Sequence, residues 1–297
     1  MTKLFEGDFK DFDKFKECRR LGIFDSGVGG LSIIKYLNDK QNVLSSDKNN
    51  KEIIYLADSG RFPYGTKSAQ EILTYTKQII QWFETQNVDL IVFGCNTASA
   101  IAGKFVYSMT NLPVLDLVEP VARYVSQLGL RVGILATQAT VRSHAFLHAI
   151  KNHAPLLKVQ EIASAELVNI VENGLVDDDR TKILLSNYID LFREQKSQIV
   201  VLSCTHFSFL KDSLLQLIGN EMQILDPAEL IANILTPDIS SINSTAIQTL
   251  EHKELITKFF VTGNLESFSA TAKKCLGYPI KNVNHLSISE LQSLTTA

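Results

Sequence analysis

The sequence predicts an α/β fold with two similar lobes, each a mostly parallel sheet flanked by helices. Short apolar runs rich in Val, Ile and Leu alternate with longer amphipathic segments from residue 21 onward, the pattern of parallel strands joined by helices. The run Leu90–Gly94 leads into Cys95. A similar run, Ile199–Ser203, leads into Cys204 in the second half of the chain. This internal repeat predicts two related halves with the active site in the cleft between them.

A second pair of segments supports the repeat, because Gly22–Ser26 is similar to Gly133–Thr137 and the interval between them is nearly the same. The strand-like runs are continuously apolar, so we expect strands that are buried on both faces, with helices in the intervals. The expected strands, in order, are Gly22–Asp25, Ile53–Asp58, Leu90–Gly94, Val114–Leu117, Val132–Ala136, Val159–Ile162, Ile199–Ser203, Gln223–Leu225, Phe259–Val261 and Val283–Leu286.

The composition is that of a globular chain with enough residues for one large or two medium domains. The chain has 297 residues, of which 45% are hydrophobic and 21% charged, and a formal net charge of −3. Charge this balanced provides no broad basic field, so nucleic acid is not an expected partner. The first residues stay charged through Arg20, and no apolar run reaches the length of a membrane span. We therefore expect a cytoplasmic protein without a membrane partner.

Cys95 and Cys204 are the candidate reactive groups. Each follows a predicted buried strand and precedes a helical segment, whose N-terminus favours a thiolate; the alternative is a buried inert thiol. Because ligands of open α/β sheets bind at the carboxyl ends of the strands, both thiols should face one cleft. Zinc is disfavoured, since the spacing of Cys204 and His206 does not match a metal-ligand pair, and no metal is expected. A Cys/His hydrolase would leave Cys95 unexplained.

Two glycine-containing loops resemble nucleotide-binding motifs without matching them. Asp25–Gly30 follows the first strand, but Ser32 stands where a dinucleotide fingerprint needs its third glycine. This loop suits a small anion such as a carboxylate, or is only a tight turn. In Gly60–Ser68, Thr66 intrudes between the second glycine and the lysine of a P-loop, so we interpret Pro63–Gly65 as a ligand-facing turn instead. No lysine lies in a Schiff-base-like motif, and no cofactor is expected.

Taken together, these motifs resemble the glutamate racemases of the aspartate/glutamate racemase superfamily, over most of the chain. The matching segments are Gly22–Leu31, Asp58 with Tyr64 and Gly65, Cys95–Ala100, Val132–Ile134, Cys204–His206, Asp226 with Pro227, and Phe260–Gly263. Four positions depart from the family pattern, and these put local loop shape and rate in question: Ser164, Ala165, Ser203 and Ser208.

The resemblance implies cofactor-independent interconversion of L- and D-glutamate by two bases, which supplies D-glutamate for peptidoglycan synthesis. Inverting a stereocentre by proton exchange requires a base on one face and an acid on the other. By analogy with the family, Cys95 acts on D-glutamate with Asp25 as its polar neighbour. Cys204 acts on L-glutamate with support from His206, and Glu172 is a further functional residue.

The same resemblance implies which residues bind the substrate and how the chain is divided. The implied substrate-binding residues are Asp25, Ser26, Tyr64, Gly65, Asn96, Thr97 and Thr205. The implied domains are an extension at 1–20, a first lobe of 21–117 plus 227–297, and a second lobe of 118–226. An aspartate racemase and a non-catalytic protein that binds a partner such as DNA gyrase remain alternatives. A homodimer and activation by a cell-wall precursor also stay open.

Overall fold

The computed structural model describes residues 10–43, 51–236 and 255–294, which form two parallel sheets with helices on both faces of each. The predicted fold class is therefore confirmed. Within the described residues the first sheet has the strand order β10-β9-β2-β1-β3-β4 and the second β6-β5-β7-β8. The strands of the first sheet are β1 (Arg20–Asp25), β2 (Glu52–Ala57), β3 (Leu90–Phe93), β4 (Val114–Leu115), β9 (Ile256–Val261) and β10 (Val283–His285). Those of the second are β5 (Val132–Ala136), β6 (Val159–Ala163), β7 (Ile199–Ser203) and β8 (Gln223–Leu225).

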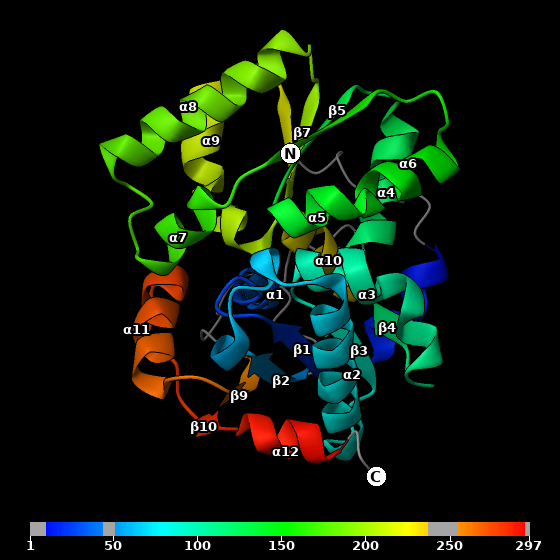
Figure 1. The fold of residues 1–297 in the computed structure, drawn as a ribbon, viewed down its shortest axis with the longest axis vertical. Coiled ribbons are helices and arrows are strands. Elements are labelled where there is room, and N and C mark those ends of the chain that lie inside the picture. Colours follow the sequence, from blue (N-terminus) through cyan, green and yellow to red (C-terminus); the bar gives the residue numbers. More distant parts are fainter. Residues whose placement is uncertain (1–9, 44–50, 237–254, 295–297) are drawn as a thin grey trace.

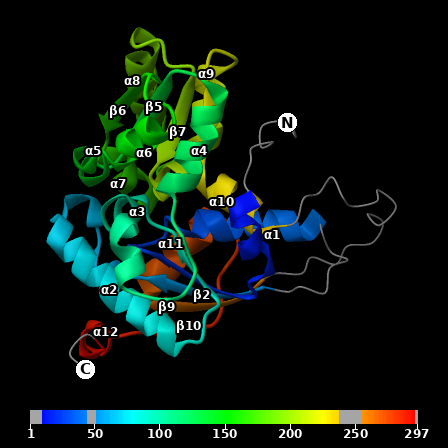
Figure 2. The same cartoon turned by 90° about the vertical axis from the view of Figure 1, so that its right-hand side faces the viewer.

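The helices separate into layers around the two sheets. Figure 1 shows the first sheet in the lower half of the molecule and the second in the upper half, and Figure 2 shows the same halves from the side. The α-helices are α1 (Leu31–Val43), α2 (Ala69–Thr85), α3 (Asn96–Ala102), α4 (Val118–Leu128), α5 (Gln138–Ser143), α6 (Ala145–His153), α7 (Glu166–Glu172), α8 (Asp179–Glu194), α9 (Lys211–Ile218), α10 (Pro227–Leu235), α11 (Leu265–Leu276) and α12 (Ile288–Ser293). The 3-10 helices are η1 (Lys10–Glu17), η2 (Ser59–Arg61), η3 (Tyr64–Thr66), η4 (Gly103–Ser108) and η5 (Thr205–Leu210).

Alternate residues of the central strands pack on opposite faces, as the two-residue period of a strand requires. Ile23 of β1 belongs to a cluster with side chains of α1 and α11, whereas its neighbour Phe24 packs with α2 and α3. In the second sheet, Ile134 of β5 packs on the side of α4 and α6, and Leu135 on the side of α8 and α9. The central strands are therefore buried on both faces, as predicted.

One hydrophobic cluster extends through both sheets. It contains Leu21 and Ile23 of the first sheet, Val132 and Val201 of the second, and residues of α10 such as Ile231. The two lobes are thus joined by a continuous apolar core on this side of the molecule.

The repeat extends to the packing of each central strand against a helix. A Cβ at Gly22 of β1 would lie 2.8 Å from the ring of Phe83 on α2, and a Cβ at Gly133 of β5 would lie 2.5 Å from Phe192 on α8. Both glycines therefore leave space for an aromatic ring, and each ring follows its glycine in the chain at a similar interval. In both halves, then, a helix places an aromatic ring against a glycine of the central strand.

All ten predicted strands are present, but the prediction of burial on both faces is wrong for three of the four edge strands. β6, β8 and β10 are largely half-buried or exposed, because strands at the margin of a sheet are covered less completely than central ones, whereas the edge strand β4 is buried. The predicted strand Val114–Leu117 ends at Leu115, where the side chain of Asp116 accepts from the backbone N–H groups that begin α4. The strand prediction extended into this helix start.

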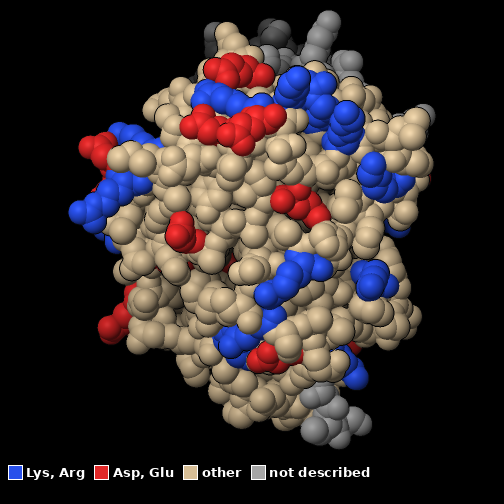
Figure 3. Space-filling view, turned by 45° about the horizontal axis from the view of Figure 1, so that its top comes forward, with Lys and Arg blue, Asp and Glu red and all other residues tan. Residues whose placement is uncertain are grey.

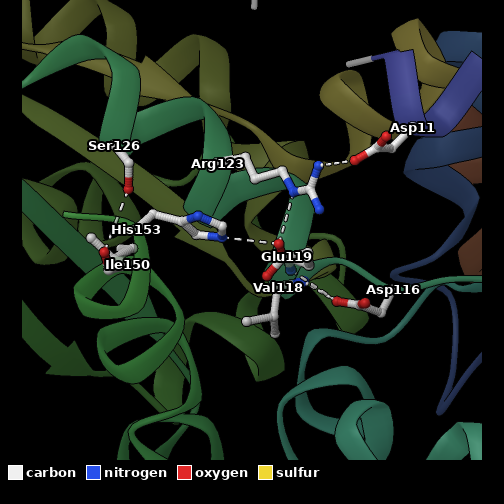
Figure 4. A network of polar contacts seen from close by, with 8 residues as sticks. All are labelled: Asp11, Asp116, Val118, Glu119, Arg123, Ser126, Ile150 and His153. Carbon is white, nitrogen blue, oxygen red and sulfur yellow. Dashed lines mark hydrogen bonds and ion pairs between the residues drawn. The ribbon is translucent and has the colours of Figure 1, made fainter. Parts of the chain in front are cut away.

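The predicted N-terminal extension 1–20 lies partly outside the described residues. Within its described part, η1 packs against α10, and its Asp11 carboxylate lies 2.7 Å from Nη1 of Arg123 on α4. Figure 4 shows that Arg123 also contacts Glu119, which in turn meets His153 of α6. The strands of 20–115 and 256–285 share the first sheet, and those of 132–225 form the second. The domain boundaries themselves stay a prediction.

The surface in Figure 3 carries acidic and basic side chains interspersed among wide uncharged areas. Within the described part of the chain, no helix combines the length and apolarity that crossing a membrane requires. The predictions about nucleic acid, membrane and location in the cell remain predictions.

Candidate active site

A cavity of about 110 Å³ lies at the carboxyl ends of the strands, between the two lobes. One water molecule needs roughly 10–15 Å³ by the same measure, and drug-sized ligands occupy roughly 300–1,000 Å³. The cavity therefore suits a small ligand. Ten of the residues predicted from the sequence line it: Asp25, Ser26, Tyr64, Gly65, Cys95, Asn96, Thr97, Cys204, Thr205 and His206.

Cys95 lies between β3 and α3, where it is the residue that precedes the first helical turn. Only 5% of the side chain is exposed. Burial raises the pKa of the Cys95 thiol far above its usual range, and the negative charge of Asp25 raises it further. The neutral thiol is accordingly the stable form of Cys95.

Asp25 ends β1 and is fully buried beside this thiol. Its Oδ1 accepts from the backbone N–H of Gly27 at 2.7 Å, and its Oδ2 accepts from Oγ1 of Thr205 at 3.2 Å. Burial raises the pKa of the Asp25 carboxyl, while the positive charge of His206 and the hydrogen bond from Gly27 oppose that effect. Asp25 thus connects the loop after β1 to the segment that carries the second thiol.

Cys204 lies at the equivalent point of the second lobe, between β7 and η5. Its Sγ atom is 3.9 Å from Nδ1 of His206, whose Nε2 is 2.7 Å from Oε1 of Glu172 on α7. Burial lowers the pKa of His206, but the hydrogen bonds to Cys204 and Glu172 outweigh it and hold that pKa well above the ordinary value. A positively charged imidazole therefore faces the second thiol.

Polar groups from both lobes surround the two thiols. The amide oxygen of Asn96 accepts from the backbone N–H groups of Cys204 and Thr205 at 3.3 and 3.2 Å, in the amide orientation that satisfies all three groups. Oγ1 of Thr97 lies 2.9 Å from Oγ1 of Thr137, which is also 2.9 Å from Oγ1 of Thr140. Hydroxyl, amide and N–H groups of this kind suit carboxylates and an ammonium group.

The turn at Tyr64 and Gly65 is hydrogen-bonded to the buried carboxylate of Asp58. Tyr64 donates its hydroxyl proton to Asp58, and Asp58 also pairs with Nε of Arg61 at 2.7 Å. Oγ1 of Thr262 donates to the other oxygen of Asp58 at 2.8 Å. Residues 62–66 of the segment that resembled a P-loop therefore line the cavity, and a role in ligand binding stays a prediction.

Glu172 is the one predicted residue that does not line the cavity. It lies behind His206 and contacts a second hollow, lined also by Gly27 and Thr271. Its position is that of a residue that orients and charges the imidazole. The roles predicted for all of these side chains stay predictions.

Pro63 belongs to the turn that the sequence predicted to face a ligand, and seven other lining residues were missed: Phe62, Thr66, Thr137, Gln138, Ala165, Val168 and Asn169. The repeat contained the signal for Thr137, because Thr137 occupies the position of Ser26 in the second lobe. Ala165, Val168 and Asn169 have the spacing of one helical face with Glu172, so the start of α7 could have been assigned to the site as a whole.

The four departures from the family pattern have separate surroundings. Oγ of Ser164 accepts from the N–H of Leu167 at the start of α7, and Ala165 lines the cavity. Oγ of Ser208 donates to Asp226 at 2.8 Å. Oγ of Ser203 is buried without a hydrogen-bond partner among the described residues, and nothing in the structure explains that hydroxyl.

The described residues contain no group of three or more His, Cys, Asp or Glu side chains placed to hold a metal ion. The expectations of no metal and no cofactor remain predictions. Two thiols line the cavity, one beside a carboxylate and the other beside an imidazole. Groups of these kinds are able to move protons.

A family model described as Asp/Glu/Hydantoin racemase matches residues 36–235. The chain belongs to this family. A glutamate racemase from Gloeothece citriformis is 31% identical over 265 residues, covering 89% of this chain and 91% of that protein. A glutamate racemase from Prochlorococcus marinus is 34% identical over 257 residues, covering 86% of this chain and 93% of that protein. The predicted resemblance and the predicted enzyme class, an isomerase of the amino-acid racemase type, are confirmed.

Solved structures of this family agree with the fold described above. Glutamate racemase from Francisella tularensis in complex with D-glutamate superposes with a TM-score of 0.77 at 29% identity, covering 94% of this chain and 99% of that one. The Escherichia coli glutamate racemase in complex with L-glutamate and the activator UDP-MurNAc-ala gives a TM-score of 0.67 at 26% identity, covering 91% and 98%.

Proposed function

We propose that this racemase interconverts L- and D-glutamate by moving protons between the substrate Cα and two thiols. The observation that carries the proposal is the arrangement of Cys95 and Cys204, which follow equivalent strands of the two lobes and line one small cavity. The naming of the relatives as glutamate racemases supports glutamate as the substrate.

The first step for L-glutamate uses Cys204 as the base. Its thiolate, opposite the imidazolium of His206, takes the α-proton, and the electron pair of the Cα–H bond remains on carbon. The thiol of Cys95 then gives its proton to the opposite face of the carbanion and becomes a thiolate. D-glutamate reacts by the same steps in reverse, and no net proton is gained or lost.

The charges around the two thiols support this starting state. Burial and Asp25 keep the Cys95 thiol neutral, and Glu172 keeps His206 positively charged beside Cys204. Backbone N–H groups and the hydroxyls of Thr97, Thr137 and Thr205 suit the two carboxylates of glutamate. Fixed dipoles of this kind also stabilise the developing negative charge at Cα.

The proposal extends to the supply of D-glutamate for peptidoglycan in a bacterial cytoplasm. A homodimer and a cell-wall precursor as activator remain part of it only as predictions; the activator complex described above belongs to the Escherichia coli relative.

The deciding experiment follows racemisation of D- and L-glutamate by circular dichroism, without added cofactor, for the wild type and for Cys95→Ser and Cys204→Ser. Wild-type turnover should fall by at least about 10³-fold in either variant, because each removes one of the two proton-transfer groups. Turnover of aspartate instead of glutamate would change the substrate and keep the mechanism. If a folded wild type racemises neither amino acid, the proposal is wrong and a binding role is favoured.

A further inference from the structure

The chain passes from one sheet to the other after β4 and again after β8, and an aspartate directly follows each of these strands. Asp116 lies between β4 and α4, and Asp226 lies at the equivalent point of the second half, between β8 and α10. Oδ1 of Asp116 accepts from the N–H groups of Val118 and Glu119 at 2.7 and 3.0 Å, as Figure 4 shows for Val118. Oδ1 of Asp226 accepts from the N–H of Ala228 at 2.9 Å. Each carboxylate therefore fixes the start of the helix that follows the crossing.

Each crossing is also bonded to a serine that lies one helical turn after one of the cavity thiols. Oγ of Ser208 donates to Oδ1 of Asp226 at 2.8 Å. In the other half, Oγ of Ser99 lies 3.4 Å from Oδ1 of Asp116 and accepts from the N–H of Leu117 at 2.9 Å. The two serines thus connect α3 and η5 to the two points where the lobes are joined.

Neither serine lines the cavity, so neither is placed to touch the substrate. Both belong to the short helices that begin immediately after a thiol. The N–H of Ser99 donates to the carbonyl of Cys95 at 2.9 Å, and in η5 the N–H of Phe207 donates to the carbonyl of Cys204 at 2.9 Å. A displacement of either serine is therefore transmitted through one helical turn to the thiol.

We propose that Ser99 and Ser208 are positioning residues, each of which holds the thiol of its own half at a fixed place relative to the opposite lobe. This inference rests on the proposed function, because it concerns the proton transfers assigned to Cys95 and Cys204. A misplacement of a reacting group by about 1 Å can lower a rate by roughly 10²-fold, so a hydrogen bond behind the site can control the reaction.

The hydrogen bond from Ser208 to its aspartate is shorter than that from Ser99. Asp226 is bonded to a further side chain, whereas Asp116 is not within the part of the chain that the structure describes. Oδ2 of Asp226 accepts from the hydroxyl of Tyr36 on α1 at 2.8 Å, and Nζ of Lys211 lies 3.3 Å from the same hydroxyl. The second crossing is thereby bonded to α1 of the first lobe and to η5 of the second. We expect loss of the Ser208 hydroxyl to have the larger effect.

The test compares Ser99→Ala and Ser208→Ala by the primary deuterium isotope effect on kcat/KM, measured with L- and D-glutamate deuterated at Cα. With Ser208→Ala, removal of the proton by Cys204 becomes slower, so the isotope effect from L-glutamate increases and that from D-glutamate decreases. Ser99→Ala should give the opposite pair of changes. We expect kcat to fall about fivefold to tenfold with KM within about twofold, since a hydrogen bond behind the site is lost.

The controls separate positioning from general loosening. Ser208→Thr retains the hydroxyl and should restore the wild-type isotope effects. Ser126→Ala removes a hydroxyl on α4 that lies 3.5 Å from the carbonyl of Ile150, and it should leave both isotope effects unchanged. If Ser99→Ala and Ser208→Ala shift both isotope effects in the same direction, or leave them unchanged, the inference is overturned.

A second measurement does not depend on racemase activity and so distinguishes failure of the inference from failure of the proposed function. Iodoacetamide labelling of each thiol is followed by peptide mass spectrometry in the same variants. Ser208→Ala should raise the labelling rate of Cys204 by about threefold or more without changing that of Cys95, and Ser99→Ala should do the reverse. Equal changes in the labelling rates of both thiols would contradict the inference that each serine positions only the thiol of its own half. This result would hold even in a protein that does not turn over glutamate.

Discussion

The two halves of the cavity place a thiol in the same way but surround it with opposite charges. Cys95 and Cys204 each follow a buried central strand, and each precedes a short helix. The charge that acts most strongly on Cys95 is the carboxylate of Asp25, whereas Cys204 faces the imidazole of His206. The shared topology determines where the thiols lie, and the unshared side chains give the two thiols different charged neighbours.

This difference suits a reaction that runs in both directions. If both thiols had the same neighbours, both would favour the same protonation state. Either the acid or the base would then be missing at the start of each turnover. An acid on one face and a base on the other are required together. The asymmetry therefore follows from the chemistry, although the fold itself is nearly symmetric.

The strongest test of this comparison exchanges the charged neighbour of each thiol for a neutral one. His206→Asn should lower kcat/KM by about 10²- to 10³-fold, because the base loses its positive partner. Since the two enantiomers are equally stable, kcat/KM falls by the same factor in both directions, and the directions are distinguished by the primary deuterium isotope effect at Cα. That isotope effect should increase from L-glutamate in His206→Asn and from D-glutamate in Asp25→Asn. Equal changes from both enantiomers in both variants would show that the two surroundings are not specialised.

A smaller effect is expected where the halves meet at the threonine hydroxyls. Thr137→Val keeps the shape of the side chain but removes a hydroxyl that lines the cavity. Losing one hydrogen bond of about 1–1.5 kcal/mol should raise KM for glutamate roughly tenfold, with a lesser change in kcat. Thr140→Val is the matched control, because its hydroxyl belongs to the same cluster but does not line the cavity. An equal rise of KM in both variants would place the effect in the cluster rather than at the substrate.

The smallest expected effect concerns the proton on His206. Glu172→Gln should lower kcat about fivefold near neutral pH and move the alkaline decline of kcat/KM to lower pH, because Glu172 helps to raise the pKa of His206. Glu166→Gln, on the exposed side of the same helix, is the control. An unchanged pH profile for Glu172→Gln would show that Glu172 does not control the protonation of His206.

The same shift has a consequence for stability. Because the folded protein holds the pKa of His206 above its unfolded value of about 6.5, this histidine contributes stability that is fully present below about pH 6.5. That contribution is lost as the pH rises through the raised pKa. Chemical denaturation of the wild type and of Glu172→Gln over this range should show a steeper decline for the wild type.

Much of the fold could be predicted because strands buried on both faces leave a continuous apolar pattern in the sequence. β5, β7 and β8 were predicted with their observed bounds. The position of the edge strand β6 was predicted, but its exposure was not. The sequence does not say which strand lies at the edge of a sheet.

The lining of the cavity could be predicted where a residue follows a strand directly, as Asp25, Cys95 and Cys204 do. It could not be predicted where contact depends on packing of distant elements. The hydrogen bond between Ser208 and Asp226 joins residues from two different connections, and sequence patterns at either position carry no sign of it. Thr137 lies between these cases, since the repeat points to it but its side chain reaches the cavity only through the placement of α5.

The apolar cluster that passes through both sheets has a consequence for how this protein comes apart. Side chains such as Ile23 and Val201 belong to the same cluster, so neither lobe has a complete interior of its own. Unfolding should therefore be a single cooperative event in which both lobes lose structure together, and an excised lobe should not be an independent module. A substitution deep in one half then lowers the stability of the other half as well, and with it the integrity of the cavity that both halves build.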